Sequence, residues 1–181
     1  MDKILPFIAS IIGFLTFSKA IIEYMKAQKW KRMEFVANQI KEFNNDIDVK
    51  KAMQMLDYTN REVELGGVEV TISNQMLESS LFPDSRGKNG DGFTHDEAHI
   101  RDIFDHFFDK LSVFNQYINS GLINLEDISP YLIYWITILG KKDNERKPKV
   151  LIDNIWKYWK AFNYVDMISL MEKFGYKNSA V

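Results

Sequence analysis

The pattern of apolar positions begins with a long helical segment at the N-terminus. Residues 4–18 carry no charge, and apolar residues resume after Lys19 as far as Met25. Four basic residues follow at once: Lys26, Lys29, Lys31 and Arg32. A helix that crosses a bilayer needs about 20 mostly apolar residues, and basic residues gather on its cytoplasmic side. The pattern therefore predicts a membrane helix with a basic flank over residues 1–32 and a cytoplasmic helical domain over residues 33–181.

Two other interpretations of the N-terminal segment stay open. A secretory signal peptide carries its basic residues before the apolar run, whereas here only Lys3 precedes it, beside Asp2. A buried or peripheral helix is the second alternative. In each case the helical period continues past the basic flank as far as Phe43, and the polar residues 44–46 indicate where it ends.

A polar stripe runs along this N-terminal helix. Its members are spaced by three, four and three residues, which places them on one side of a helix: Thr16, Lys19, Glu23 and Lys26. Lys19 and Glu23 can form a local ion pair between successive turns. The other interpretation is a pore or assembly face, because ionisable groups at membrane depth usually face protein or water.

The remaining pattern predicts a small, mainly α domain with one β-hairpin. Asp48 can cap a short helix, and residues 61–72 alternate around Gly66 and Gly67, which is a signal for a two-residue hairpin. Residues 83–92 have the composition of a loop. Ser129 and Pro130 predict the start of a buried helix that ends at Gly140, and two amphipathic helices follow it.

A central helix over about residues 95–120 is the best-marked element. Thr94 and Glu97 form a capping box, and Gly121 is suited to the C-terminal stop. Its apolar face is broad: Ile100, Ile103, Phe104, Phe107, Leu111, Phe114 and Ile118. A polar stripe lies opposite: His95, His99, Asp102, His106 and Asp109. We therefore expect the three histidines to face solvent or another subunit.

Three interpretations compete for the histidine stripe. It can be a solvated face with Asp102 and His106 paired between turns. It can be a metal site, because two histidines four residues apart with a following carboxylate have workable ligand spacing. It can also be a site that handles nucleotides or RNA. We expect no metal and no cofactor. The histidines lack a third fixed ligand type and a supporting shell, and the loop at residues 83–92 lacks both the spacing of a calcium-binding loop and its glutamate at the twelfth position.

Composition narrows the chemistry further. The 181 residues have a formal net charge of −2, so attraction to nucleic acid would need a local basic patch. The absence of cysteine excludes disulfides, thiolate zinc sites and a cysteine nucleophile. Neither a glycine-rich phosphate loop nor a serine nucleophile elbow occurs, so catalysis has little support outside the central helix.

Arg101, Asp102 and His106 form a pattern that resembles the R-polar-x-x-x-H signature of HEPN domains. In that superfamily, paired arginines and histidines form a composite site for metal-independent RNA cleavage. Together with the apolar N-terminus, the basic flank and the length, the layout resembles the membrane-associated accessory protein of type VI-B CRISPR systems. This resemblance covers the whole chain in layout, but only those three residues as a motif.

The resemblance implies a HEPN-like helical protein that assembles into a ring-like pore and enhances RNA-targeting CRISPR antiphage defence. Its implied location is the bacterial inner membrane, as a single-pass protein with a cytoplasmic C-terminal domain. The implied partners are the lipid bilayer, further copies of the chain and, functionally, the RNA-guided effector; RNA is a weaker candidate. The alternatives are a membrane-tethered HEPN ribonuclease and a membrane-anchored helical interaction module.

Charge around the motif argues against the ribonuclease. Asp102, Asp105 and Asp109 surround His106, and three carboxylates would repel the phosphate backbone that a single arginine attracts. On a regular helix Arg101 and His106 also lie roughly 140° apart, so one motif would not converge on one phosphate. We therefore expect these two residues to hold structure or subunit contacts rather than to catalyse a reaction.

Overall fold

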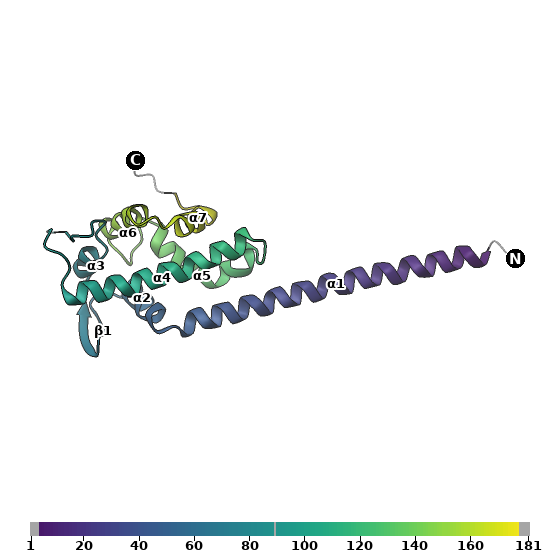
Figure 1. Ribbon diagram of the computed structural model, residues 1–181, viewed down its shortest axis with the longest axis horizontal. Helices are drawn as coiled ribbons and strands as arrows, with labels where there is room; N and C mark the ends of the chain where they lie inside the picture. The colour runs from purple at the N-terminus through teal and green to yellow at the C-terminus, as the bar shows by residue number, and fades with distance from the viewer. Residues whose placement is uncertain (1–3, 89, 178–181) are drawn as a thin grey trace. The chain divides into compact units, whose positions relative to one another are not determined.

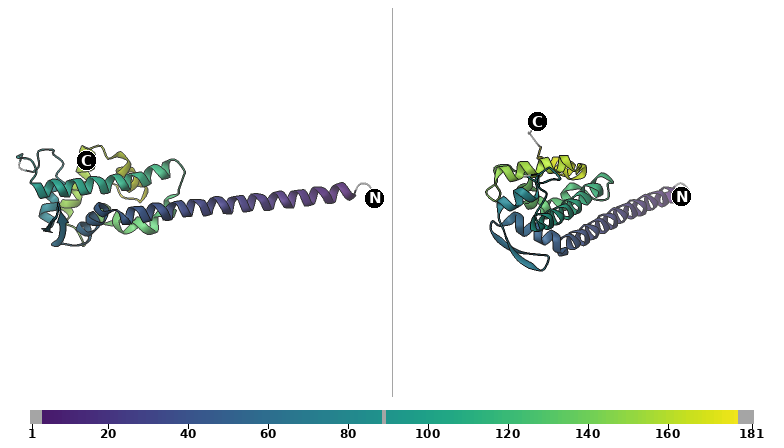
Figure 2. Two further views of the ribbon diagram at one scale, coloured as in Figure 1. Left: turned by 60° about the horizontal axis from the view of Figure 1, so that its bottom comes forward. Right: turned by 60° about the vertical axis from the view of Figure 1, so that its left-hand side comes forward.

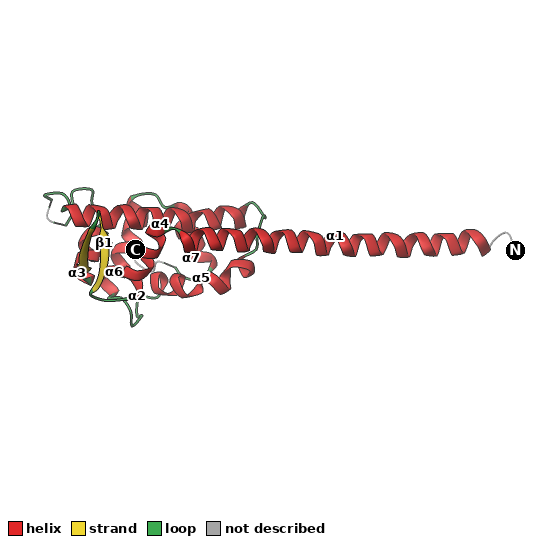
Figure 3. Cartoon of the chain, turned by 90° about the horizontal axis from the view of Figure 1, so that it is seen from below, coloured by secondary structure: helices red, strands yellow, loops and turns green. Residues whose placement is uncertain are grey.

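The structure is a computed structural model that describes residues 4–88 and 90–177, with side chains from Ile12 onward. These residues are mainly helical with one β-hairpin, as the sequence predicted (Figures 1 and 3). The helices are α1 (Ile4–Asn45), α2 (Ile47–Asp57), α3 (Asn74–Ser80), α4 (His95–Asn119), α5 (Leu125–Gly140), α6 (Lys149–Ala161) and α7 (Val165–Lys173). The strands are β1 (Arg61–Leu65) and β2 (Val68–Ile72). The chain divides into two compact units, Met1–Gln39 and Ile40–Val181.

The prediction of a membrane-spanning helix needs correction. Among the described residues, no helix combines the length and the apolar character that crossing a bilayer requires. In α1 the described side chains begin at Ile12 and reach Lys19 after seven residues, a rise of about 10 Å. Part of the prediction rested on the side chains of residues 4–11, which lie outside the described set. On this finding, the membrane helix, the pore and the single-pass inner-membrane location are wrong.

The second unit is built around α4. This helix lies between α2 on one side and α7 on the other (Figures 1 and 2). Its buried face is rich in phenylalanine, and the Phe108 ring meets Trp159 of α6 edge-on at 5.3 Å between centroids. Trp159 in turn meets Trp156 at 5.1 Å. Edge-to-face pairs of this kind add about 0.5–1.5 kcal/mol to the burial of the rings themselves, so the core is held by aromatic packing.

Local contacts fix both the start of α4 and the hairpin beside it. The Glu97 amide donates to Thr94 Oγ1 at 3.3 Å, and the Thr94 amide donates to Glu97 Oε2 at 2.9 Å. Gly66 and Gly67 both have positive φ, at 59° and 89°, which the tight turn between β1 and β2 requires. A Cβ on Gly66 would lie 2.8 Å from the His99 ring, so glycine also allows the turn to approach α4.

Two helices begin at residues that the sequence did not indicate. The N-cap of α2 is Asp46, and not Asp48, because the Asp46 carboxylate accepts hydrogen bonds from the amides of Asp48 and Val49. Helix α5 begins at Leu125, where Asp127 accepts a hydrogen bond from the Asn124 amide at 2.8 Å. Pro130 therefore lies inside α5 instead of opening it.

One buried lysine joins three segments of the second unit. Lys147 precedes α6 and is only 2 % exposed. Its ammonium donates to the Tyr58 carbonyl at 2.9 Å and to Asn74 Oδ1 at 3.0 Å. It thereby connects the loop before α6 to the end of α2 and to the start of α3. A buried charge is tolerated in a protein only with such partners.

Candidate functional site

Arg101 of α4 is held by contacts within the second unit. Its Nη1 donates to the carbonyls of Ser80 and Phe82, both at 3.2 Å. The guanidinium also lies over three aromatic rings at 4.5–4.6 Å from their centroids: Phe93, Tyr158 and Phe162. A guanidinium suits this position because it is planar and only weakly hydrated, and can stack while it donates. Arg101 therefore ties the segment after α3 to the end of α6.

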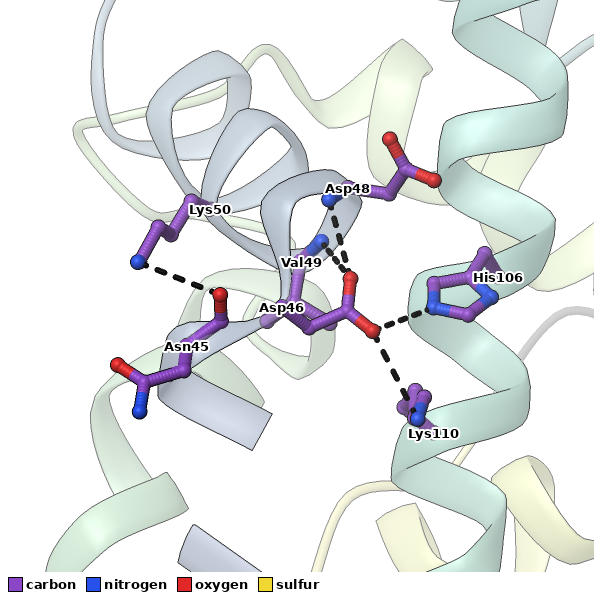
Figure 4. A network of polar contacts seen from close by, with 7 residues as sticks. All are labelled: Asn45, Asp46, Asp48, Val49, Lys50, His106 and Lys110. Carbon is purple, nitrogen blue, oxygen red and sulfur yellow. Dashed lines mark hydrogen bonds and ion pairs between the residues drawn. The ribbon is translucent and has the colours of Figure 1, made fainter. Parts of the chain in front are cut away.

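His106, the other end of the motif, contacts a different part of the fold. Its Nε2 lies 2.8 Å from Asp46 Oδ2, and the Lys110 ammonium lies 3.6 Å from the same oxygen (Figure 4). The other carboxylate oxygen of Asp46 accepts from the Asp48 and Val49 amides at 3.0 and 3.2 Å. The network joins α4 to the N-terminus of α2, and His106 is half-buried rather than free on a solvated face.

The Asp46 carboxyl is tuned by this network. Burial alone raises its pKa, but the hydrogen bond and charge of His106, together with the two backbone amides, lower it by more. The net pKa of Asp46 lies below its ordinary value of 3.8. Asp46 is therefore a carboxylate at neutral pH, as an N-cap and ion-pair acceptor needs to be.

Asp46, Asp48 and His106 bring three ligating atoms within 4.8 Å of one another, the one such group among the residues that the structure describes. Sequence reasoning did not single out this group, because it assigned the histidines to another face. The arrangement fits an ion-pair network better than a cation site. Both oxygens of Asp46 already accept hydrogen bonds, and the Lys110 ammonium occupies the space beside Oδ2.

Arg101 and His106 do not converge. The arginine contacts Ser80, Phe82 and the end of α6, whereas the histidine contacts the start of α2. Asp102, between them, is exposed. Metal-independent cleavage of RNA would need a general acid or base and a phosphate-binding cation around one scissile bond. Within the second unit the motif does not supply that arrangement.

The other two histidines lie by the hairpin. The rings of His95 and His99 are 4.3 Å apart between centroids, and His99 contacts the turn at Gly66. The His95 side chain is 78 % exposed. Asp102 does not join them in any group of ligating atoms found among the described side chains. A metal site formed by His95, His99 and Asp102 therefore has no geometric support.

A pocket of about 350 Å³ opens between α4, the end of α6 and the segment before α7. It is lined by Arg101, Asp105, Asp109, Tyr158, Phe162, Asn163 and Tyr164. Asp105 Oδ1 accepts hydrogen bonds from the hydroxyls of Tyr158 and of Tyr164, the latter at 2.8 Å. Burial of each tyrosine, together with its hydrogen bond to Asp105, raises the pKa of both phenols far above the ordinary value. Both hydroxyls therefore remain hydrogen-bond donors.

Only some of the residues that line this pocket could be identified from the sequence. Arg101 was singled out through the motif, and Asp105 and Asp109 through their charge. The aromatic residues of α6 were expected to form core, and nothing in their spacing indicates that two of them also line a cavity. Asn163 has a positive φ of 59°, which lets the chain turn sharply between α6 and α7 and closes one side of the pocket.

The polar stripe of α1 is exposed in the first unit. Lys19 and Glu23 form an ion pair at 3.8 Å with side chains 77 % and 66 % exposed. Thr16 donates to the Ile12 carbonyl at 2.9 Å, and Lys26 is exposed. The opposite side of the same turns is also exposed although it is apolar: Phe14, Phe17, Ile21, Tyr24 and Met25.

Comparisons of the chain with models of protein families, with curated proteins and with solved structures found no match. The HEPN-like resemblance thus rests on the residues themselves. Its motif residues are placed by the structure in two separate networks, one at the end of α6 and one at the start of α2.

Proposed function

We propose that this chain is a helical assembly protein whose copies associate through α1, and that it does not cleave RNA. The observation that carries the proposal is the exposed apolar face on α1. Phe14, Phe17, Ile21 and Tyr24 are 43–69 % exposed and are spaced by three, four and three residues. That spacing gives the a and d positions of two successive heptads, the pattern by which helices pack on one another.

The partner that fits this face best is a second copy of the same helix. In the same heptads, Thr16 and Glu23 occupy c positions and Lys19 and Lys26 occupy f positions, which point away from a helix–helix seam. Met25, at an e position beside the seam, and Leu15 and Ile22, at b positions beyond it, extend the exposed apolar surface to one side of the seam. A helix with so broad an apolar face can contact two neighbours at once, which favours a closed oligomer of more than two copies.

The role of the HEPN-like motif in this proposal is structural. Arg101 and His106 each join elements of the second unit, and both have partners that a catalytic group would have to give up. The resemblance to a CRISPR accessory protein supplies the biological setting. In that setting the oligomer would support antiphage defence by an RNA-targeting effector, with the effector and not this chain cutting the RNA.

The mass of the full-length protein in solution, measured by light scattering or native mass spectrometry, tests the assembly. We expect a closed oligomer for the natural sequence. Phe17→Glu should dissociate it, raising the dissociation constant about 30-fold, as expected when a buried aromatic anchor is lost. Thr16→Glu is the matched control, because it introduces the same charge one residue away on the polar side and should leave the oligomer intact.

The outcomes are decisive for both halves of the proposal. A monomeric natural protein, or equal effects of Phe17→Glu and Thr16→Glu, would show that this face does not assemble the chain. Incubation with labelled single-stranded RNA tests the second half, and the RNA should remain intact. Cleavage that His106→Gln abolishes without changing thermal unfolding would instead establish a ribonuclease.

A further inference from the structure

The pocket beside Arg101 is not used by the proposed assembly. It lies in the second unit, between α4, α6 and the segment before α7, and has a volume of about 350 Å³. Small-molecule sites in proteins begin at about this size. Its lining combines three aromatic side chains with two carboxylates and one arginine. The question is which ligand chemistry these groups would recognise.

The two carboxylates lie on successive turns of one face of α4 and differ in their partners. Asp105 accepts hydrogen bonds from two tyrosine hydroxyls, which orient it. Asp109 has no hydrogen bond or ion pair within the described part of the chain. Partial burial and then the charge of Asp105 raise the pKa of Asp109, which is still exposed, against a smaller effect of His106. Asp109 is thus a carboxylate whose charge the fold leaves largely uncompensated.

Arg101 does not compensate that charge. No nitrogen of its guanidinium lies within ion-pair distance of Asp105 or Asp109 among the described contacts. Instead it donates to two backbone carbonyls and stacks on the rings of Tyr158 and Phe162. An anion would therefore meet two carboxylates and an arginine that is already committed. A cation would meet carboxylates at short range, with apolar ring surface available for the carbon atoms next to its charge.

The form of the cation follows from the same contacts. A guanidinium ligand gains most from stacking on aromatic faces, and Arg101 already uses faces of Tyr158 and Phe162. An ammonium group needs no ring face, and its three donors can be shared between neighbouring carboxylates. Its alkyl chain would pack on the aromatic wall, as lysine stems pack on apolar surfaces.

We propose that this pocket binds a primary alkylammonium group, seated between Asp105 and Asp109 with its alkyl chain against Phe162 and Tyr164. The group can belong to a free alkylamine or to a lysine side chain of a partner protein. Both sources present the same atoms to the pocket. Asp109 supplies the main attraction, and Asp105, fixed by its two tyrosines, positions the ligand.

Titration of the full-length protein with putrescine, followed by calorimetry or by NMR shifts, tests the proposal. We expect saturable binding to the natural sequence. Asp109→Asn should weaken it about tenfold or more, the loss expected for one hydrogen bond to a charged group. Asp102→Asn is the matched control, because Asp102 is an exposed carboxylate of the same helix that does not line the pocket, and it should leave affinity within about twofold.

Two further ligands test whether the charge is required and whether the ammonium group comes from a free amine or from a lysine side chain. The equally long uncharged diol should not bind. A blocked lysine, acetylated at its α-nitrogen and amidated at its carboxyl, should bind as well as putrescine if the pocket takes protein side chains, and distinctly less well if it takes free amines. Absence of putrescine binding, binding of the diol, or equal affinities for the natural protein and Asp109→Asn would overturn the proposal.

Because Asp109 is exposed and makes no hydrogen bond in the described residues, its replacement should not affect folding. Thermal unfolding of both aspartate variants, compared with the natural protein, verifies this. The result is also independent of assembly through α1, since the Phe17→Glu variant should bind putrescine with unchanged affinity. Loss of binding in that variant would contradict a pocket contained in the second unit.

Discussion

The Asp46 carboxylate connects two helices of the second unit. One of its oxygens caps α2, and the other contacts His106 and lies near Lys110 of α4. Asp46 thereby makes the start of one helix depend on a side chain of another, sixty residues later. Hydrogen bonds to charged groups contribute about 1.5–3 kcal/mol when shielded, and less here because the His106 side chain is 40 % exposed.

Replacement of this residue gives a prediction with a defined pH dependence. Asp46→Asn keeps a good N-cap but removes the charge, so unfolding in urea at neutral pH should show a loss of about 1 kcal/mol. Because the folded pKa of Asp46 is lower than the unfolded value of 3.8, its contribution is complete above that value. The contribution disappears as pH falls through the folded pKa, so the two proteins should converge in strong acid.

Asp48→Asn is the control for this measurement. Asp48 lies two residues later, and its carboxylate makes no hydrogen bond among the described contacts. The same substitution there should change stability by only a few tenths of a kcal/mol, through the helix dipole. Equal losses at the two positions, or a difference that persists in strong acid, would contradict the role assigned to the Asp46 charge.

The sequence could indicate that an aspartate caps this helix, but not which one. Asp46 and Asp48 are both good caps, and local preference does not separate them. The choice is made by His106, which is far away in sequence. The partners of the motif residues could not be predicted from the sequence either. Helical spacing indicates that Arg101 and His106 point in different directions. It does not reveal the backbone carbonyls and aromatic rings that contact Arg101, or the carboxylate that contacts His106.

At the scale of the elements, the end of α5 shows a packing constraint that spacing alone does not reveal. The sequence predicted that a buried helix ends at Gly140, and α5 does end there. The tertiary structure explains why this last residue is glycine, since a Cβ on Gly140 would collide with the ring of Tyr176. The Tyr176 hydroxyl donates to Thr137 at 3.1 Å, so the ring is held against the last turn of α5.

Gly140→Ala should therefore destabilise the protein although alanine is the better helix former. We expect a net loss of about 1–2 kcal/mol in urea unfolding, because overpacking costs about 1–3 kcal/mol and the helix preference returns less than 1 kcal/mol at a helix end. In a Tyr176→Ala background the penalty should vanish. In Tyr176→Phe, which keeps the ring, it should persist; an unchanged penalty in both backgrounds would exclude the collision.

Periodicity was most successful for long elements with good caps and failed where tertiary contacts decide. Helix α4 and the hairpin have local signals, a capping box and paired glycines, and both form where those signals stand. Helix α5 starts five residues before Pro130, because Asn124 and Asp127 provide an earlier start and the helix tolerates the missing amide. For α1, the apolar composition led to the prediction of a membrane-spanning helix. That prediction is wrong, because no helix of the described residues is long and apolar enough to cross a bilayer.

At the scale of the whole molecule, Lys147 holds together parts of the second unit that no helix joins. Its neighbours Lys141 and Arg146 are exposed, and the sequence offered no sign that this lysine alone is buried. Burial lowers the pKa of Lys147 to about 8, against a smaller opposing effect of Asp57. The charged form is thus less stable in the folded protein than in the unfolded chain.

This gives the second unit a pH response on the alkaline side. Between a folded pKa of about 8 and an unfolded value of 10.5, the unfolded chain binds more protons, so stability should rise with pH. The slope can reach about 1.4 kcal/mol per pH unit. Lys147→Met should abolish the rise, whereas Lys141→Met should preserve it; a flat profile in the natural protein would show that Lys147 is not desolvated.

The aromatic core also makes the two units distinguishable by optical spectroscopy. Trp156 and Trp159 are buried in the second unit at 5.1 Å, close enough for their excited states to couple and give a circular dichroism couplet. Trp30 of the first unit is 71 % exposed and should emit at long wavelength without contributing to that couplet. Melting of the second unit is therefore visible as loss of the couplet, whatever happens to the part of α1 in the first unit. The second unit thus carries its own reporter, and no dye is needed to follow its melting.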